Sequence, residues 1–400
     1  MKLPLILISA ILLMALCCCA HAALPGDKNG DNTLEKSEIT GIILNSLQNS
    51  TQLQDAMDAS WVYTCWNGTP KVITDTSGTV RTLSHPLHRV VVMNSETLET
   101  MRSTGYDTSR IVGVDKYTLQ KPEFFPEFSD TPGVGSIWAP DYEKIISLRP
   151  DAVFLYATVS QSSADEIEHR LSGTVPGITI LRFDGYQPDT YPDEILKISK
   201  LLDCEEKGKE FLDFYTGNVR SVTDISSKIP ENDTVRVYFE TWNDYKSCAG
   251  GSGYQQKIAM AGGNNIFAGE PAEYPEIDPE AVIARSPQVI VKLVGSGKYA
   301  FGGYGGGNET GYSVLYSDLL SRKGWDSLEA VREGRVHLIH TDIVGGPQYF
   351  IGMQYMAKWF YPDLFDSLEP ENIHTEYLVR FQGLAPLDPE TQVFVYPSGG

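Results

Sequence analysis

The sequence of 400 residues predicts an α/β fold in which one long helix joins two related lobes. An internal repeat predicts the two lobes, because residues 141–156 match residues 278–293 without a gap. Short apolar segments alternate with helical segments in both halves, as in parallel sheets that are buried on both faces. The connecting helix follows from a long stretch of apolar residues at helical spacing between the halves.

The two copies of the repeat carry the same signals for a helix followed by a strand. Asp141 and Asp278 are suited to cap a helix N-terminus, and Glu143 and Glu280 stand in the first turn, where the helix dipole favours negative charge. A proline then ends each helix, and a short apolar run follows it. We therefore expect one equivalent helix–strand unit in each lobe.

Further segments fit the same division. We expect strands at residues 90–93, 111–114, 178–181, 235–239 and 335–339, and helices at 97–104 and 254–262. The connecting helix is expected over residues 191–228, with Gly208 as the candidate point of interruption. A helix of about 35 residues spans roughly 50 Å, which is long enough to lie across both lobes.

The N-terminus has the pattern of a secretory signal peptide over residues 1–22. An apolar run from Leu3 to Leu16 is followed by Ala-His-Ala, so the mature chain is expected to begin near Ala23. A transmembrane anchor is the alternative, but no later segment approaches the roughly 20 apolar residues that cross a bilayer. We expect an exported protein, either extracellular or at the cell-envelope face of the cytoplasmic membrane, with its means of tethering left open.

The composition argues against a nucleic-acid partner. The chain has 52 acidic and 32 basic residues, which gives a formal net charge of −20 at pH 7. A phosphate backbone would be repelled over most of such a surface. Small molecules and other proteins are therefore the partners to consider.

A twelve-residue segment that starts at Asp27 has oxygen-bearing groups at the spacing of a calcium loop. Position 6 is Asn32 rather than glycine, and asparagine tolerates the left-handed backbone required there. The segment resembles EF-hand and dockerin modules, although dockerins carry two such loops and only one is found. An acidic, solvated linker is the alternative to bound Ca²⁺. The expected ligands are Asp27, Asn29, Asp31, the Thr33 carbonyl, Glu35 and Glu38.

Several segments in a fixed order carry a family resemblance. They are residues 89–95, 133–151, 260–265 and 277–287, together with the helical stretch between the halves. From about residue 81 to residue 365, the chain resembles the class III periplasmic binding proteins, which serve ABC importers of iron siderophores, haem and vitamin B12. The resemblance implies two Rossmann-like lobes with a ligand cleft between them and only small hinge motion.

The resemblance also implies the function and the partners. We expect the extracytoplasmic substrate-binding component of an ABC importer, a monomer that captures a metal chelate and delivers it to a permease and its ATPase. In this family one acidic residue on each lobe docks onto the permease, and the matching positions are Glu143 and Glu280. Ordinary acids at helix starts are the alternative explanation of these two residues.

The expected domain organisation has six parts. They are a signal peptide (1–22), an EF-hand-like helical segment (23–60), the first lobe (61–188), the connecting helix (189–228), the second lobe (229–365) and a C-terminal extension (366–400). No role can be assigned to the extension from the sequence.

Ligands of open α/β folds bind beyond the carboxyl ends of the strands, so residues just after each expected strand are candidates for the cleft. Aromatic side chains among them offer a large contact area to a bulky chelate. The glycine-rich segment 295–307 is expected to form a flexible lip or a passive surface loop. The candidates are Asn94, Ser95, Lys116, Tyr117, Trp138 and Tyr156 in the first lobe, and Trp242, Tyr245, Tyr254, Tyr304 and Tyr349 in the second.

Other classes of protein are less well supported. The sequence has no Gly-x-Ser-x-Gly or His-Glu-x-x-His motif, so we expect neither an enzyme nor a catalytic cofactor. His337 and His340 are three apart on an expected strand and should face opposite sides of it. A dockerin-bearing hydrolase and a carrier of a bare transition-metal ion are the alternatives, and the latter would require several converging His or carboxylate ligands.

Overall fold

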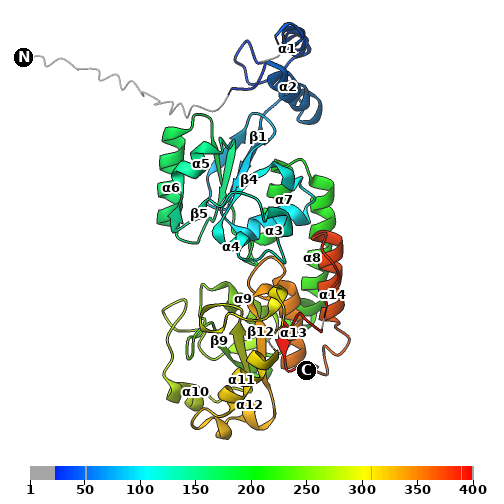
Figure 1. Cartoon of the computed structure of the whole chain (residues 1–400). Coiled ribbons are helices and arrows are strands. Elements are labelled where there is room, and N and C mark those ends of the chain that lie inside the picture. Colours follow the sequence, from blue (N-terminus) through cyan, green and yellow to red (C-terminus); the bar gives the residue numbers. More distant parts are fainter. Residues whose placement is uncertain (1–22, 50–51, 308, 389, 399–400) are drawn as a thin grey trace, which may run out of the picture. The chain divides into compact units, whose positions relative to one another are not determined.

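The computed structural model describes residues 23–49, 52–307, 309–388 and 390–398 (Figure 1). The predicted signal peptide lies outside these residues. The chain divides into two compact units, Met1–Lys71 with Thr82–Pro86, and Val72–Arg81 with Leu87–Gly400. The first unit extends past the expected boundary at residue 60, because a helix runs through that position.

The smaller unit contains a pair of helices, α1 (Lys36–Gln48) and α2 (Leu53–Cys65). Apolar side chains at helical spacing are buried between them, with Ile39 and Ile42 from α1 and Ala56, Ala59 and Val62 from α2. A backbone hydrogen bond of 2.7 Å from Leu34 N–H to Gly68 C=O ties the segment before α1 to the segment after α2. The strands β1 (Lys71–Thr74) and β2 (Val80–Leu83) follow and pair with one another.

The first lobe of the larger unit is built on a parallel sheet of order β4-β3-β7-β8. Val91, Val153 and Leu155 form part of its buried core. The strands are β3 (Val90–Val92), β4 (Ile111–Val114), β7 (Ala152–Leu155) and β8 (Thr179–Arg182), and a short ribbon consists of β5 (Gly135–Ser136) and β6 (Ala139–Pro140). The helices are α3 (Ser95–Ser103), α4 (Lys116–Leu119), α5 (Tyr142–Ser147) and α6 (Gln161–Thr174).

The second lobe repeats this order in a sheet β10-β9-β11-β12, to which β13 adds an antiparallel edge. Its core surrounds Tyr238, Ile290 and Trp325. The strands are β9 (Val235–Glu240), β10 (Gly263–Asn265), β11 (Val289–Val294), β12 (Val336–His340) and β13 (Val395–Tyr396). The helices are α9 (Gly253–Met260), α10 (Pro279–Arg285), α11 (Glu309–Leu320), α12 (Glu329–Arg332) and α13 (Tyr349–Phe360).

The predicted repeat is confirmed as α5–β7 in the first lobe and α10–β11 in the second. The expected caps are present, since the Asp141 side chain accepts a hydrogen bond from Lys144 N–H and the Asp278 side chain accepts one from Glu280 N–H. In each sheet the repeat strand has the same place in the order, beside β3 in the first lobe and beside β9 in the second. The lobes are therefore equivalent in topology.

The equivalence extends to single residues. Arg149 and Ser286, which precede the two repeat prolines, both adopt the left-handed conformation, with φ of 48° and 44°. The side chains of Asp151 and Gln288, which follow the prolines, each accept a hydrogen bond from a backbone N–H group at the start of the neighbouring strand. Their donors are Arg89 N–H at 2.7 Å and Arg236 N–H at 3.1 Å.

The predicted single connecting helix is wrong. The chain forms two helices, α7 (Tyr191–Leu201) and α8 (Glu205–Ser226), which pack against one another. Asp203 between them has φ of 58°, a left-handed conformation that ends α7. Gly208, the expected interruption, lies inside α8, where a Cβ atom would stand 2.3 Å from the Ser199 side chain, so glycine allows the close approach of the two helices. Only α8, roughly 33 Å long, extends from one lobe to the other (Figure 1).

Residues after 366 are not a separate extension. After α14 (Pro370–Glu376), Tyr377 and Phe381 pack on the Phe211 ring of α8, and Gln382 accepts a hydrogen bond of 2.6 Å from Arg102 of the first lobe. Strand β13 then completes the sheet of the second lobe. This C-terminal segment therefore contacts both lobes.

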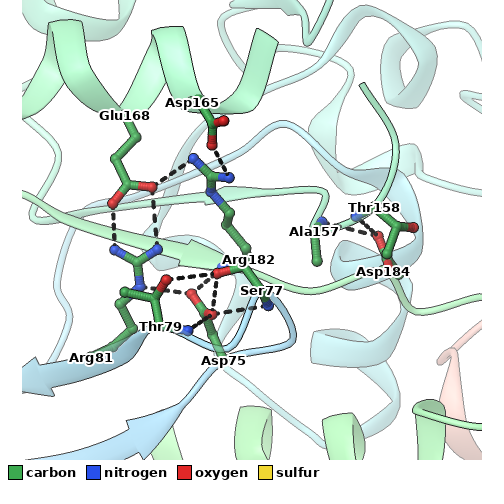
Figure 2. A network of polar contacts seen from close by, with 10 residues as sticks. All are labelled: Asp75, Ser77, Thr79, Arg81, Ala157, Thr158, Asp165, Glu168, Arg182 and Asp184. Carbon is green, nitrogen blue, oxygen red and sulfur yellow. Dashed lines mark hydrogen bonds and ion pairs between the residues drawn. The ribbon is translucent and has the colours of Figure 1, made fainter. Parts of the chain in front are cut away.

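A network of ion pairs holds the turn between β1 and β2 against the first lobe (Figure 2). The buried Asp75 carboxylate accepts hydrogen bonds from the Arg81 guanidinium at 2.7 Å and from Ser77 N–H at 3.0 Å. Glu168 of α6 bridges Arg81 and Arg182 at 2.6 and 2.7 Å. The same picture shows Asp184, whose carboxylate accepts hydrogen bonds from the backbone N–H groups of residues 157 and 158.

Candidate functional site

A cavity of about 890 Å³ lies between the two lobes of the larger unit. Each lobe contributes residues that follow the carboxyl ends of its strands, as expected for an open α/β fold. Six of the eleven predicted cleft residues line it. They are Ser95, Trp138 and Tyr156 from the first lobe, and Trp242, Tyr254 and Tyr304 from the second.

The wall of the cavity is strongly aromatic. Nine Phe, Trp or Tyr side chains line it, and they come from both lobes. Phe124 of the first lobe stacks on Tyr304 of the second with ring centroids 4.4 Å apart, and Trp242 contacts Tyr274 at 4.9 Å. Such surfaces bind a large ligand by contact area, with few rotamers to immobilise.

The other five predicted residues lie outside the cavity. Asn94 is fully buried, where its side chain caps α3 by accepting from Thr97 N–H and donates to Phe183 C=O. Lys116 and Tyr117 are exposed at the start of α4, and the Tyr117 ring meets Trp138 edge-on at 6.1 Å.

The remaining two belong to the core. Tyr245 packs on Trp325 in the second lobe, and Tyr349 is fully buried with its hydroxyl bonded to that of Tyr215 of α8. A position after a strand predicts which end of the sheet a residue occupies, but it does not predict the direction of the side chain.

An ion pair joins the lobes at the floor of the cavity. The Lys121 amine of the first lobe lies 2.8 Å from the Asp342 carboxylate of the second, and the His340 ring lies 3.2 Å from the same carboxylate. Burial raises the pKa of Asp342, but Lys121 and His340 more than offset it, so that the pKa is well below its usual range. Asp342 therefore stays ionised.

Two buried ionisable groups line the cavity without an ion pair within 4 Å in the described chain. The Lys257 amine donates to the carbonyl groups of Val344 at 2.9 Å and Gly345 at 3.2 Å, and its burial lowers its pKa to about 7. Burial raises the pKa of Glu99 to about 8, although a hydrogen bond from the Tyr377 hydroxyl opposes the shift. At neutral pH, Glu99 is mostly protonated and Lys257 is partly neutral.

The glycine-rich segment 295–307 contributes Tyr304 to the floor of the cavity. Tyr304 is only 6% exposed, and its hydroxyl is bonded to the His374 ring at 2.7 Å. Gly303 has φ of 69°, and a Cβ atom there would stand 2.4 Å from the Asp342 carboxylate. Glycine is needed because the backbone passes this close to the ion pair.

Sequence reasoning missed several residues of the cavity wall that lie on helices or in loops. Glu96 lies in the first turn of α3 and Glu99 in the second, so the strand-end rule extended by two helical turns would have found both. Tyr186 follows β8 in the same way. Nothing in the sequence points to Lys121 or Tyr274.

Glu143 and Glu280 are exposed in the first turns of α5 and α10, one on each lobe. Neither residue lines the cavity. Their equivalent places in the repeat give the protein two matching acidic positions.

In the described part of the chain, no histidine lines the cavity. His337 stacks on Trp359 at 4.3 Å, whereas His340 contacts Asp342, so the two rings have separate surroundings. The cleft therefore lacks the converging imidazole ligands that a bare transition-metal ion would favour.

Two equivalent α/β lobes that enclose an aromatic cavity define a two-lobed solute-binding protein. A family model described as periplasmic binding protein matches residues 90–343. Since this match covers more than half of the sequence, the chain belongs to the periplasmic binding protein family. The family consists of solute-binding proteins rather than enzymes, which confirms the prediction that the chain is not an enzyme.

Known proteins agree with this assignment. The ABC transporter substrate-binding lipoprotein YvrC of Bacillus subtilis is 23% identical over 229 residues, covering 56% of this chain and 66% of that protein. The vitamin B12-binding protein of Vibrio parahaemolyticus is 23% identical, covering 66% of this chain and 85% of that protein. The TroA-like periplasmic binding protein FepB of Veillonella parvula shares the fold, with a TM-score of 0.71, 24% identity, and coverage of 82% and 99%.

The matches have limits in length. The chain spans 66, 64 and 44% of the length of three curated relatives that it matches. Membership of the family places the chain among exported proteins of the cell envelope. Among the helices of the described ranges, none is both long and apolar enough to cross a bilayer.

Proposed function

We propose that this chain is the substrate-binding component of an ABC importer and that it carries a metal chelate, such as a ferric siderophore, haem or a corrinoid, in the cleft between its lobes. The observation that carries the proposal is the aromatic cavity of about 890 Å³ between equivalent lobes. A cavity of this size suits a ligand far larger than a bare ion. A vitamin B12-binding protein among the relatives supports the choice of a chelate.

Binding of the chelate should raise the unfolding temperature, because the ligand binds only the folded state. At a ligand concentration of about 100 Kd the stabilisation is roughly 2.7 kcal/mol, or about 3 °C for a chain of this size. The measurement is a thermal-shift screen of the full chain with ferric siderophores, haem and corrinoids. A screen in which no chelate changes the unfolding temperature would contradict the proposal.

The aromatic wall provides a matched pair of variants for this screen. Trp242→Ala removes a ring that lines the cavity, and we expect about 30-fold weaker binding, since large buried aromatic contacts contribute roughly 2 kcal/mol. Tyr245→Phe, on the same loop but outside the cavity, should leave the affinity unchanged.

We further propose that Glu143 and Glu280 are the two contacts to the permease. Both are exposed, and each stands at the same position of its lobe. Reversing both charges with Glu143→Lys and Glu280→Lys should preserve chelate affinity and abolish stimulation of the transporter's ATPase, because rim charges steer and orient a partner. The control variant, Glu166→Lys with Glu333→Lys, changes the net charge equally at other exposed acids. Normal stimulation by the first variant would remove this assignment.

A second proposal concerns Ca²⁺ in the loop before α1. In support, the backbone N–H groups of Gly30 and Asn32 donate to the Asp27 carboxylate at 2.7 and 2.9 Å, and those of Lys28 and Asn29 donate to Glu38. The loop is thus already wound around its acidic side chains. The ligands would be Asp27, Asn29, Asp31, the Thr33 carbonyl, Glu35 and Glu38, a set of oxygen donors suited to a hard cation.

Calorimetric titration of the full chain tests this proposal. We expect one Ca²⁺ to bind, Mg²⁺ to compete weakly, and Glu38→Gln to lower the Ca²⁺ affinity at least tenfold because it removes the bidentate ligand. Equal heats with Glu38→Gln and with the unchanged chain would argue against calcium binding in this loop.

A further inference from the structure

The charged groups around the cleft are unequal in number. Four carboxyl groups line the cavity but only two amines, and the described chain places no arginine in the lining. The carboxyl groups belong to Glu96, Glu99, Glu273 and Asp342, and the amines to Lys121 and Lys257.

Both amines are already engaged by the protein. Lys121 forms its ion pair with Asp342, which leaves that pair without net charge. Lys257 is 1% exposed, donates to two backbone carbonyl groups, and is partly neutral at pH 7. Asp342 therefore offsets the charge of Lys121, and Lys257 carries only part of a positive charge at neutral pH.

Two of the carboxylates remain without an ion pair. Glu96 accepts hydrogen bonds from the Tyr156 hydroxyl and from the Ser95 hydroxyl, which are neutral donors. Within the described chain, no Lys or Arg amine lies within 4 Å of either Glu96 or Glu273. Negative charge and hydrogen-bond acceptors therefore face the ligand.

Two helices also begin at the cavity, α3 in the first lobe and α9 in the second, and helix N-termini attract anions. Both are capped by the chain itself, since Asn94 accepts from Thr97 N–H and Ser252 accepts from Gln255 N–H. Glu96 in the first turn of α3 adds a carboxylate at the end where an anion would bind. The two helix N-termini therefore do not offset the excess of carboxyl groups over amines in the cavity lining.

We infer, on the basis of the proposed function, that the cleft selects chelates that carry no net negative charge and that present hydrogen-bond donors at their periphery. Aromatic rings supply the contact area, and the acidic and phenolic oxygen atoms accept from amide or ammonium groups of the ligand. A polyanionic chelate would meet the unpaired carboxylates of Glu273, which is exposed, and of Glu96, which is half-buried and therefore less well screened by solvent.

The test is a titration of the full chain, followed by quenching of tryptophan fluorescence, with three chelates of different charge. The probes are cyanocobalamin, which is neutral and rich in amides, ferrioxamine B, which is cationic, and ferric enterobactin, which is trianionic. We expect at least a hundredfold tighter binding of cyanocobalamin or ferrioxamine B than of ferric enterobactin. Tighter binding of ferric enterobactin would overturn the inference and leave the proposed function intact, whereas binding of none would contradict the proposed function itself.

Variants separate charge from shape. The double variant Glu96→Gln with Glu273→Gln removes two negative charges and keeps the size of both side chains. It should lower the affinity for ferrioxamine B about tenfold and change the affinity for cyanocobalamin less than about threefold. The affinity for ferric enterobactin should rise. Glu333→Gln, an exposed acid outside the cavity, is the control. An equal effect of the double variant on all three probes would show that these carboxylates do not select by charge, which overturns the inference.

Discussion

Glu240→Gln should destabilise the second lobe by about 3–5 kcal/mol, because it leaves a buried lysine without its counter-charge. The Glu240 carboxylate is fully buried and lies 2.9 Å from the Lys292 amine and 2.7 Å from the Arg322 guanidinium. The Lys292 side chain is also fully buried, and its amine donates hydrogen bonds to the backbone carbonyl groups of Thr241 and Asn243, on either side of Trp242. The same cluster therefore fixes the loop that carries part of the cleft wall.

Urea unfolding followed by circular dichroism measures this effect. The matched control is Glu329→Gln, whose pair with Arg236 is half exposed and should contribute no more than about 1 kcal/mol. Replacing both buried partners, with Glu240→Leu and Lys292→Met, should recover part of the loss, since no uncompensated amine remains. If Glu240→Gln and Glu329→Gln have equal effects, the buried pair does not stabilise the lobe.

The second large effect concerns pH. Glu99 has a pKa of about 8 in the folded chain, whereas in the unfolded chain its pKa is near the ordinary value of 4.5. Between these values the folded state holds a proton that the unfolded state has lost. Stability is therefore lost as the pH rises from about 4.5 to 8, by roughly 5 kcal/mol as an upper limit, and levels off above pH 8.

Glu99→Gln removes this titration, so the variant should become more stable than the unchanged chain as the pH rises through that window. Lys257 titrates in the opposite sense, because its folded pKa of about 7 makes stability rise between pH 7 and its unfolded value of 10.5. The Glu99→Gln variant and the unchanged chain must therefore be compared at each pH, since Lys257 makes the same contribution to the free energy of unfolding of both. Parallel curves of unfolding free energy against pH would mean that Glu99 is not buried in its neutral form.

The repeat predicted the architecture because its signals are local. Asp141 and Asp278 cap their helices with their own side chains, and the strands after Pro150 and Pro287 are apolar except for Lys292. The sequence did not predict the break between α7 and α8 at residues 202–204, because apolar residues keep their helical spacing across this turn. The break is set by the left-handed backbone of Asp203, which the spacing does not indicate.

The site was predicted less completely than the fold. The strand-end rule found Tyr156 and Tyr254 but also selected Tyr349, whose ring is turned into the core toward α8. The ion pair of Lys121 and Asp342 joins residues 221 positions apart, and no pattern in the sequence relates them. Contacts between lobes depend on tertiary packing, which the spacing of residues along the chain does not encode.

Strand β13 has a consequence for how the protein reaches its native state. It pairs with β12 from more than 50 residues further along the chain, after the Tyr377 segment has crossed to the first lobe. The first sheet needs no residue beyond β8, but the second sheet gains its edge only from residues 395–396. Because β12 and β13 are separated by a long loop, we expect completion of the second sheet to be a late step of folding.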